Sequence, residues 1–241
     1  MASVADHYER HLGEIYTWMQ GGFEAGCARA LAELRALGIE RTESHLAVDL
    51  GAGFGSHAVP LADLGWTVVA FERCGPLLRE LTQHAAGRAI NVIDSDLSGF
   101  SRHLTRPADL ILCLGDTLTH LPGASTVREL TSAVGASLAP GGRFIATFRD
   151  YTRALEGSAR FIAVRSEATQ ILTCFLEYDE SKVQVHDLIH RLTGEGWRLS
   201  VSSYPKLRLD PGWVARELEG AGLHVQTGTT AGGMTRILAQ R

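Results

Sequence analysis

The sequence predicts an α/β protein whose central sheet is mostly parallel and carries helices on both faces. Three observations support this fold class: β-rich apolar segments alternate with helical periodicities, the connections are short, and glycine or acidic residues follow several of the segments. A chain of 241 residues is long enough for one α/β domain over 1–241. We divide it into N-terminal helices (1–40), a ligand-binding core (46–150) and inserted antiparallel strands (160–208).

The composition is that of an ordinary globular protein, with 45% hydrophobic and 21% charged residues. The net charge of -4 provides no basic field for nucleic acid, and no apolar run approaches the length of a membrane span. The first ten residues carry charges and lack the apolar core of a secretion signal, so we expect a cytoplasmic protein. Four scattered cysteines predict reduced thiols rather than a disulfide framework or a zinc knuckle.

The first forty residues have helical periodicity in two pieces, divided near Gly21-Gly22. Gly38 is suited to end the second piece. Aromatic residues at helical spacing pack into a core or form a lid over a ligand pocket, and we favour packing only for Phe23. Both alternatives stay open for Tyr8, Tyr16 and Trp18.

A glycine-rich turn follows the first predicted strand. The strand ends at Leu50, and Gly51, Gly53 and Gly55 precede a helix expected over 57–64. Glycines at this spacing let the backbone turn tightly and approach a ligand that a Cβ would block, and amides at the helix start would face that ligand. The turn predicts contact with a nucleotide-like ligand, although an ordinary glycine-rich turn would have the same residues.

The second and third predicted strands, 66–72 and 89–93, are each followed by acidic residues. Glu72 closes the second strand about twenty residues beyond the glycines, a position from which a carboxylate accepts hydrogen bonds from a ribose diol. The helix between them begins at Pro76, which suits a first helical turn. Asp96 and Leu97 follow the third strand.

The strongest buried-strand pattern, 108–114, comes next, and a helix over 126–138 connects it to a strand over 143–148. Ligands of parallel sheets bind at the carboxyl ends of the strands, near the point where the strand order reverses. Five residues lie at such predicted ends: Gly51, Glu72, Asp96, Leu114 and Phe148.

The pattern then changes to an antiparallel meander of three strands over 169–178, 183–190 and 197–203. This meander would cover the ligand crevice, brace a sheet edge or form the contact of a homodimer. A helix that starts with Asp210-Pro211 and two last strands complete the predicted sheet.

Together these landmarks resemble the class I S-adenosylmethionine-dependent methyltransferases. The stretch 49–55 resembles the first motif of that family, D-x-G-x-G-x-G, and Glu72 corresponds to the acid that binds the ribose. Asp96-Leu97 stands where the family holds the adenine, and Leu114-Gly115 resembles its fourth motif. Two further stretches, 113–121 and 149–151, look similar to glycine N-methyltransferase-like enzymes.

The resemblance implies a Rossmann-like seven-stranded methyltransferase sheet, with an N-terminal helical lid and an inserted antiparallel β meander. It also implies methyl transfer from S-adenosyl-L-methionine to a small-molecule acceptor, most often an amine nitrogen. Other readings are an O- or S-methyltransferase, a nicotinamide-dependent oxidoreductase, and a non-catalytic subunit that binds the cofactor. The nicotinamide fingerprint G-x-G-x-x-G is not met, because Ser56 occupies the position of its third glycine.

Methyl transfer requires that the acceptor lone pair be held in line with the methyl carbon and that water be excluded. On the acceptor side, the candidate catalytic residues are His120, Arg149 and Tyr151. His120 would act as a base or orienter, or simply contact a helix end, and Arg149 would clamp a carboxylate or pair with Asp150. The residues expected to bind the cofactor are Asp49, Gly51, Ala52, Gly53, Glu72, Arg73, Asp96, Leu97, Leu114 and Tyr16.

His186 and His190 are the histidines best spaced for a metal site, since residues four apart share one face of a strand or helix. No H-E-x-x-H sequence or cysteine pair accompanies them. We therefore predict no metal and expect these side chains to face solvent or the acceptor pocket.

Overall fold

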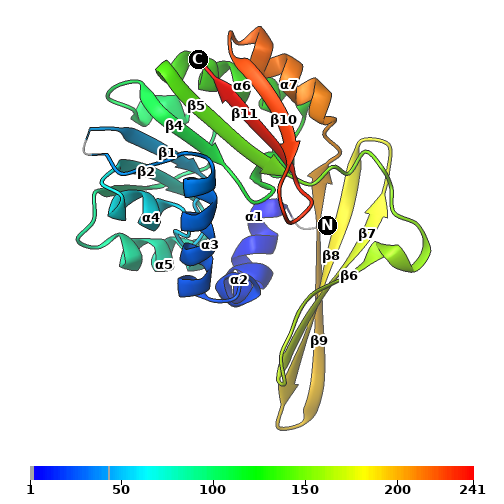
Figure 1. Ribbon diagram of the computed structural model, residues 1–241. Helices are drawn as coiled ribbons and strands as arrows, with labels where there is room; N and C mark the ends of the chain where they lie inside the picture. The colour runs from blue at the N-terminus through cyan, green and yellow to red at the C-terminus, as the bar shows by residue number, and fades with distance from the viewer. Residues whose placement is uncertain (1–2, 43) are drawn as a thin grey trace.

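The largest unit of the computed structural model, which describes residues 3–42 and 44–241, is a seven-stranded sheet (Figure 1). Its strand order is β10-β11-β5-β4-β1-β2-β3, and all pairings are parallel except those of β10 and β11. This sheet confirms the predicted fold class. The strands are β1 (Leu46–Leu50), β2 (Thr67–Glu72), β3 (Ile90–Asp94), β4 (Ala108–Cys113), β5 (Leu138–Phe148), β10 (His224–Thr229) and β11 (Thr235–Gln240).

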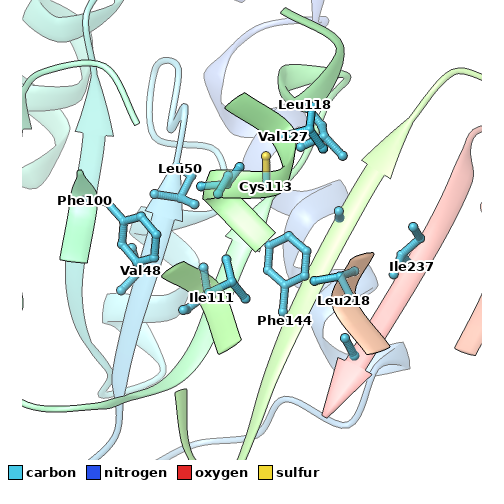
Figure 2. Packing of buried hydrophobic residues seen from close by; sticks show 14 of the residues in the cluster. Val48, Leu50, Phe100, Ile111, Cys113, Leu118, Val127, Phe144, Leu218 and Ile237 are labelled. Atoms are coloured by element: carbon cyan, nitrogen blue, oxygen red, sulfur yellow. The ribbon is translucent and has the colours of Figure 1, made fainter. Parts of the chain in front are cut away.

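Helices cover both faces of this sheet. Alternate strand residues supply the two cores: Val48 and Leu50 pack on one side, and Ala47 packs on the other. Figure 2 shows the first core, in which Phe144 lies near Leu218. The first core is covered by α6 (Ala124–Ser137) and α7 (Pro211–Gly220), and the second by α3 (Phe23–Ala36), α4 (Ala58–Asp63) and α5 (Gly75–Ala85).

A second, smaller sheet is entirely antiparallel and has the order β6-β7-β8-β9. Three of its strands match the predicted meander, but β6 was missed. The register of β6 shifts between Ala163 and Arg165, so its residues do not alternate between buried and exposed. The strands are β6 (Phe161–Ser166), β7 (Gln170–Tyr178), β8 (Lys182–Thr193) and β9 (Gly196–Leu207).

The N-terminal helices lie between the two sheets (Figure 1). The predicted break is confirmed, since Gly21 and Gly22 have φ values of 90° and 93°. Three residues lie outside the described part of the chain: Met1, Ala2 and Glu43. The first two begin the N-terminal stretch that was considered above for a secretion signal. This region consists of α1 (Val4–His7), the π-helical turn η1 (Tyr8–Leu12) and α2 (Gly13–Met19).

The described residues also form three short 3-10 turns: η2 (Phe100–His103), η3 (Thr117–His120) and η4 (Gly157–Arg160). No helix within 3–42 and 44–241 has the length and hydropathy needed to cross a membrane. The outer face of the small sheet exposes Trp197, Leu199 and Val201, each about half accessible to solvent. A homodimer contact and a cytoplasmic location both stay predictions.

Candidate active site

A cavity of about 640 Å³ opens where the carboxyl ends of β1, β2, β3 and β4 meet the N-terminal helices and the end of β9. The volume lies within the range of small-molecule sites, roughly 300–1,000 Å³. The strand order reverses between β1 and β4, so the cavity occupies the switch point of the sheet. Eight of the predicted site residues line it: Tyr16, Gly51, Gly53, Glu72, Arg73, Asp96, Leu97 and His120.

Five other predicted residues do not line the cavity. Asp49 points from β1 toward the side of the sheet that holds α3 and α4, where burial raises its pKa to about 6. Ala52 and Leu114 are buried in the core on that same side. Arg149 is exposed, and Tyr151 is buried behind the wall of the cavity.

Gly51 and Gly53 of the glycine turn line the cavity. A Cβ on Gly51, whose φ is 78°, would come within 2.8 Å of the Thr117 side chain. The amides of Gly51 and Ala52 donate to the carbonyl oxygen of Phe71, over 3.0 and 2.8 Å. These two amides are therefore already paired at the end of β1, whereas the expectation that amides at the helix start face a ligand stays a prediction.

Glu72 is held by three backbone amides at the end of β2. Its Oε1 accepts from Arg73 and Cys74, both over 2.8 Å, and its Oε2 accepts from Gly53 over 2.7 Å. Burial raises the pKa of this carboxyl, and the three amides act against that shift by stabilising the carboxylate. Each carboxylate oxygen can accept two hydrogen bonds, so Oε2 retains capacity for a hydroxyl group.

Asp96 and Arg73 form the opposite rim of the same end of the cavity. Asp96 Oδ1 accepts from the amide and the hydroxyl of Ser98, and Asp96 Oδ2 lies 3.4 Å from Arg73 Nη1. Leu97 lies beside them as an apolar surface. This combination of an acceptor and an apolar side chain suits a flat heterocycle that carries an amino group.

His120, at the end of η3, belongs to the other end of the cavity. Its ring centroid lies 5.4 Å from that of Tyr8 and 5.8 Å from that of Tyr204. Burial, and then the nearby positive charge of Lys206, lower the pKa of His120 to about 3. The imidazole is therefore neutral near pH 7, and its buried Nε2 has no hydrogen-bond partner among the described residues.

Asp116 connects three segments behind this wall. Its Oδ2 accepts from the Tyr151 hydroxyl over 3.0 Å and from Lys206 Nζ over 2.5 Å, and its Oδ1 accepts from the Arg149 amide over 3.0 Å. Although burial opposes it, the Lys206 ammonium keeps the pKa of Asp116 below its ordinary value. Sequence reasoning missed Asp116 and Lys206, which are 90 positions apart.

Arg149 and Tyr151 therefore contribute in ways that differ from the expected ones. The structure uses the backbone of Arg149, not its guanidinium, and Asp150 accepts from Thr152 instead of pairing with Arg149. The Tyr151 hydroxyl faces Asp116 and not the cavity.

The histidines and cysteines show no metal-binding arrangement in the described part of the chain. His186 Nε2 lies 2.7 Å from Glu177 Oε2, and neither His186 nor His190 lines the cavity. The cysteines form no disulfide within the described ranges, and burial raises the pKa of each thiol: Cys27, Cys74, Cys113 and Cys174.

Comparisons of sequence find curated relatives, whereas no family model matches the chain. A glycine/sarcosine N-methyltransferase of Parasynechococcus marenigrum is 29% identical over 160 residues, which cover 64% of this chain and 56% of the relative. A glycine/sarcosine/dimethylglycine N-methyltransferase of Actinopolyspora halophila is 28% identical over 127 residues, 52% of this chain and 22% of the relative. The chain thus spans about half, or less, of the length of these relatives.

Solved structures match almost the whole chain at low identity. An amino pentose methyltransferase from Micromonospora echinaspora, solved with S-adenosylmethionine bound, has a TM-score of 0.76 and 18% identity over 95% of both chains. The CcbJ methyltransferase from Streptomyces caelestis has a TM-score of 0.71 and 22% identity, over 99% of this chain and 96% of its own. The chain has the fold of the class I S-adenosylmethionine-dependent methyltransferases, and its sequence is similar to that of their glycine N-methyltransferase-like branch.

Proposed function

We propose that this protein transfers a methyl group from S-adenosyl-L-methionine to an amine nitrogen of a small molecule. One observation carries the proposal: a single cavity joins the glycine turn and Glu72 to a neutral imidazole, that of His120. The names of the relatives support the choice of nitrogen, as does a structural neighbour described as a sugar N-methyltransferase.

The residues at the first end of the cavity fit the proposed cofactor. The bare turn at Gly51 and Gly53 leaves room for its amino-acid part, and Glu72 has an oxygen free to accept from a ribose hydroxyl. Asp96 and Leu97 provide an acceptor and an apolar surface for the adenine. When bound, the cofactor supplies a methyl group that already carries its leaving group.

The residues at the other end would hold the acceptor. His120 Nε2 is buried and unpaired among the described residues, so it can form a hydrogen bond with an amine and orient its lone pair. A neutral imidazole also avoids placing a second positive charge beside Lys206. Tyr8 and Tyr16 reach the cavity from the N-terminal helices, which would help to exclude water once the ligands are bound.

His120 should give no limb to the pH dependence of kcat/KM between pH 5 and 8. With its pKa lowered to about 3, the imidazole loses its proton well below that window and stays neutral throughout it. We expect loss of the proton from the free acceptor amine, and not from His120, to raise kcat/KM with pH. A limb near pH 6.5 that disappears in His120→Asn would contradict the neutral state assigned to this side chain.

The proposed reaction is tested by release of S-adenosylhomocysteine across a panel of amine, carboxylate, phenol and thiol acceptors. Turnover of amines alone supports N-methylation, whereas turnover of phenols or thiols alone assigns the other methyltransferase readings. Binding of the cofactor without turnover of any acceptor would favour a non-catalytic subunit.

A further inference from the structure

The N-terminal segment is anchored on both sides of the cavity by three consecutive residues. His7 Nε2 lies 2.9 Å from Asp187 Oδ2 on the small sheet, and Tyr8 lines the cavity. Glu9 also lines the cavity, and its carboxylate contacts the start of α5. Because consecutive helical residues point in different directions, one turn of the segment spans all three surfaces.

The contact of Glu9 is a hydrogen bond that caps a helix. Its Oε2 accepts from the amide of Gly75, the first residue of α5, over 2.7 Å. The first amides of a helix have no partner within it, and the residue before α5, Cys74, provides no side-chain cap. A carboxylate at this position is also favoured by the helix dipole.

The same turn of backbone holds Glu72. The amides of Arg73 and Cys74 donate to Glu72, and the next amide, that of Gly75, donates to Glu9. Three successive amides thus bind two carboxylates, one in the proposed ribose site and one in the N-terminal segment. The position of the segment is therefore tied to the backbone that orients Glu72.

The absence of a side chain at position 75 leaves room for this contact. A Cβ on Gly75 would come within 2.8 Å of Glu9 Oε1 and meets no other residue that closely. The backbone there is helical, so alanine would fit its conformation and disturb mainly the carboxylate.

We propose that Glu9 is a positioning residue that latches the N-terminal segment over the bound cofactor by capping α5. The proposal rests on the proposed function, since it takes the ligand beneath the segment to be S-adenosylmethionine or its product. Glu9 acts through Gly75, and the latch controls how fast the ligand leaves.

The test is the dissociation rate of S-adenosylhomocysteine, followed by stopped-flow fluorescence. Glu9→Ala should release it about tenfold faster, the factor that corresponds to about 1.4 kcal/mol. Glu9→Gln should restore part of the slow release, because its amide oxygen can still accept from Gly75. Glu14→Ala is the matched control: Glu14 is exposed, as Glu9 is, but it pairs with the Arg79 side chain of α5 and caps no backbone amide of that helix.

Gly75→Ala provides an independent variant that keeps the charge of Glu9. It should also speed release about tenfold, and in both variants the amides of 4–19 should exchange hydrogen faster with the ligand bound. Slow release in Gly75→Ala together with fast release in Glu9→Ala would mean that Glu9 touches the ligand directly, which overturns the latch. Wild-type rates in both variants overturn the latch alone, whereas wild-type protein that fails to bind S-adenosylhomocysteine overturns the proposed function as well.

Discussion

Replacement of Glu72 by alanine is expected to weaken the binding of S-adenosylhomocysteine by at least about a hundredfold, or about 2.8 kcal/mol. The change removes the acceptor proposed for the ribose, and it also leaves the amides of Gly53, Arg73 and Cys74 without their partner. The turn that shapes the cavity would lose its common anchor. Isothermal titration calorimetry measures the effect directly.

Asp94→Ala is the control for this experiment. Asp94 ends the neighbouring strand in register with Glu72, but it is exposed and does not line the cavity. We expect it to leave the affinity within about twofold, as for a surface substitution. An unchanged affinity in Glu72→Ala would remove the ribose assignment.

Asp116→Asn is expected to lower the free energy of unfolding by about 3–5 kcal/mol, the usual result of breaking a buried ion pair from one side. The side chains of Lys206 and Asp116 are only 9% and 5% exposed, so the ammonium would lose its counter-ion without gaining water. Asp116 has a φ of 80°, which asparagine also tolerates, so the backbone should be preserved. Urea denaturation provides the measurement.

A double variant separates the charge from the packing. Adding Lys206→Met to Asp116→Asn should recover most of the lost stability, because it removes the unpaired ammonium and retains an apolar side chain. Tyr151→Phe removes one donor to Asp116 and should cost only about 1 kcal/mol. Additive losses in the double variant would show that the pair is not coupled.

The end of the cavity that we propose for the cofactor was largely predictable as a cluster, because its residues lie at the ends of successive strands. Gly51, Gly53, Glu72 and Asp96 each follow or close a predicted strand, and the parallel topology brings such positions together. Asp49 begins the glycine motif, but it does not line the cavity. Side chains alternate between the two faces of β1, and that of Asp49 points toward α3 and α4.

The acceptor end was predicted less well, because long-range contacts form it. Lys206 comes from β9 and meets Asp116 where the small sheet contacts the large one near η3. No local sequence pattern indicates that a lysine will be buried. Arg149 belongs to the stretch 149–151 that resembles the glycine N-methyltransferase-like enzymes, but its side chain is exposed. The hydrogen bonds from the amides of Gly51 and Ala52 to the Phe71 carbonyl oxygen likewise depend on the register of β1 and β2. The spacing of the glycines does not specify that register.

Methyl transfer to nitrogen is tested most directly by following the methyl group itself. The protein is incubated with S-adenosylmethionine labelled with carbon-13 in the methyl group and with amines from the acceptor panel, and the product is analysed by nuclear magnetic resonance. We expect the labelled methyl group to be bonded to the acceptor nitrogen, with one S-adenosylhomocysteine formed per methyl group transferred. Label on oxygen or sulfur, or no labelled product from any amine in the panel, would contradict it.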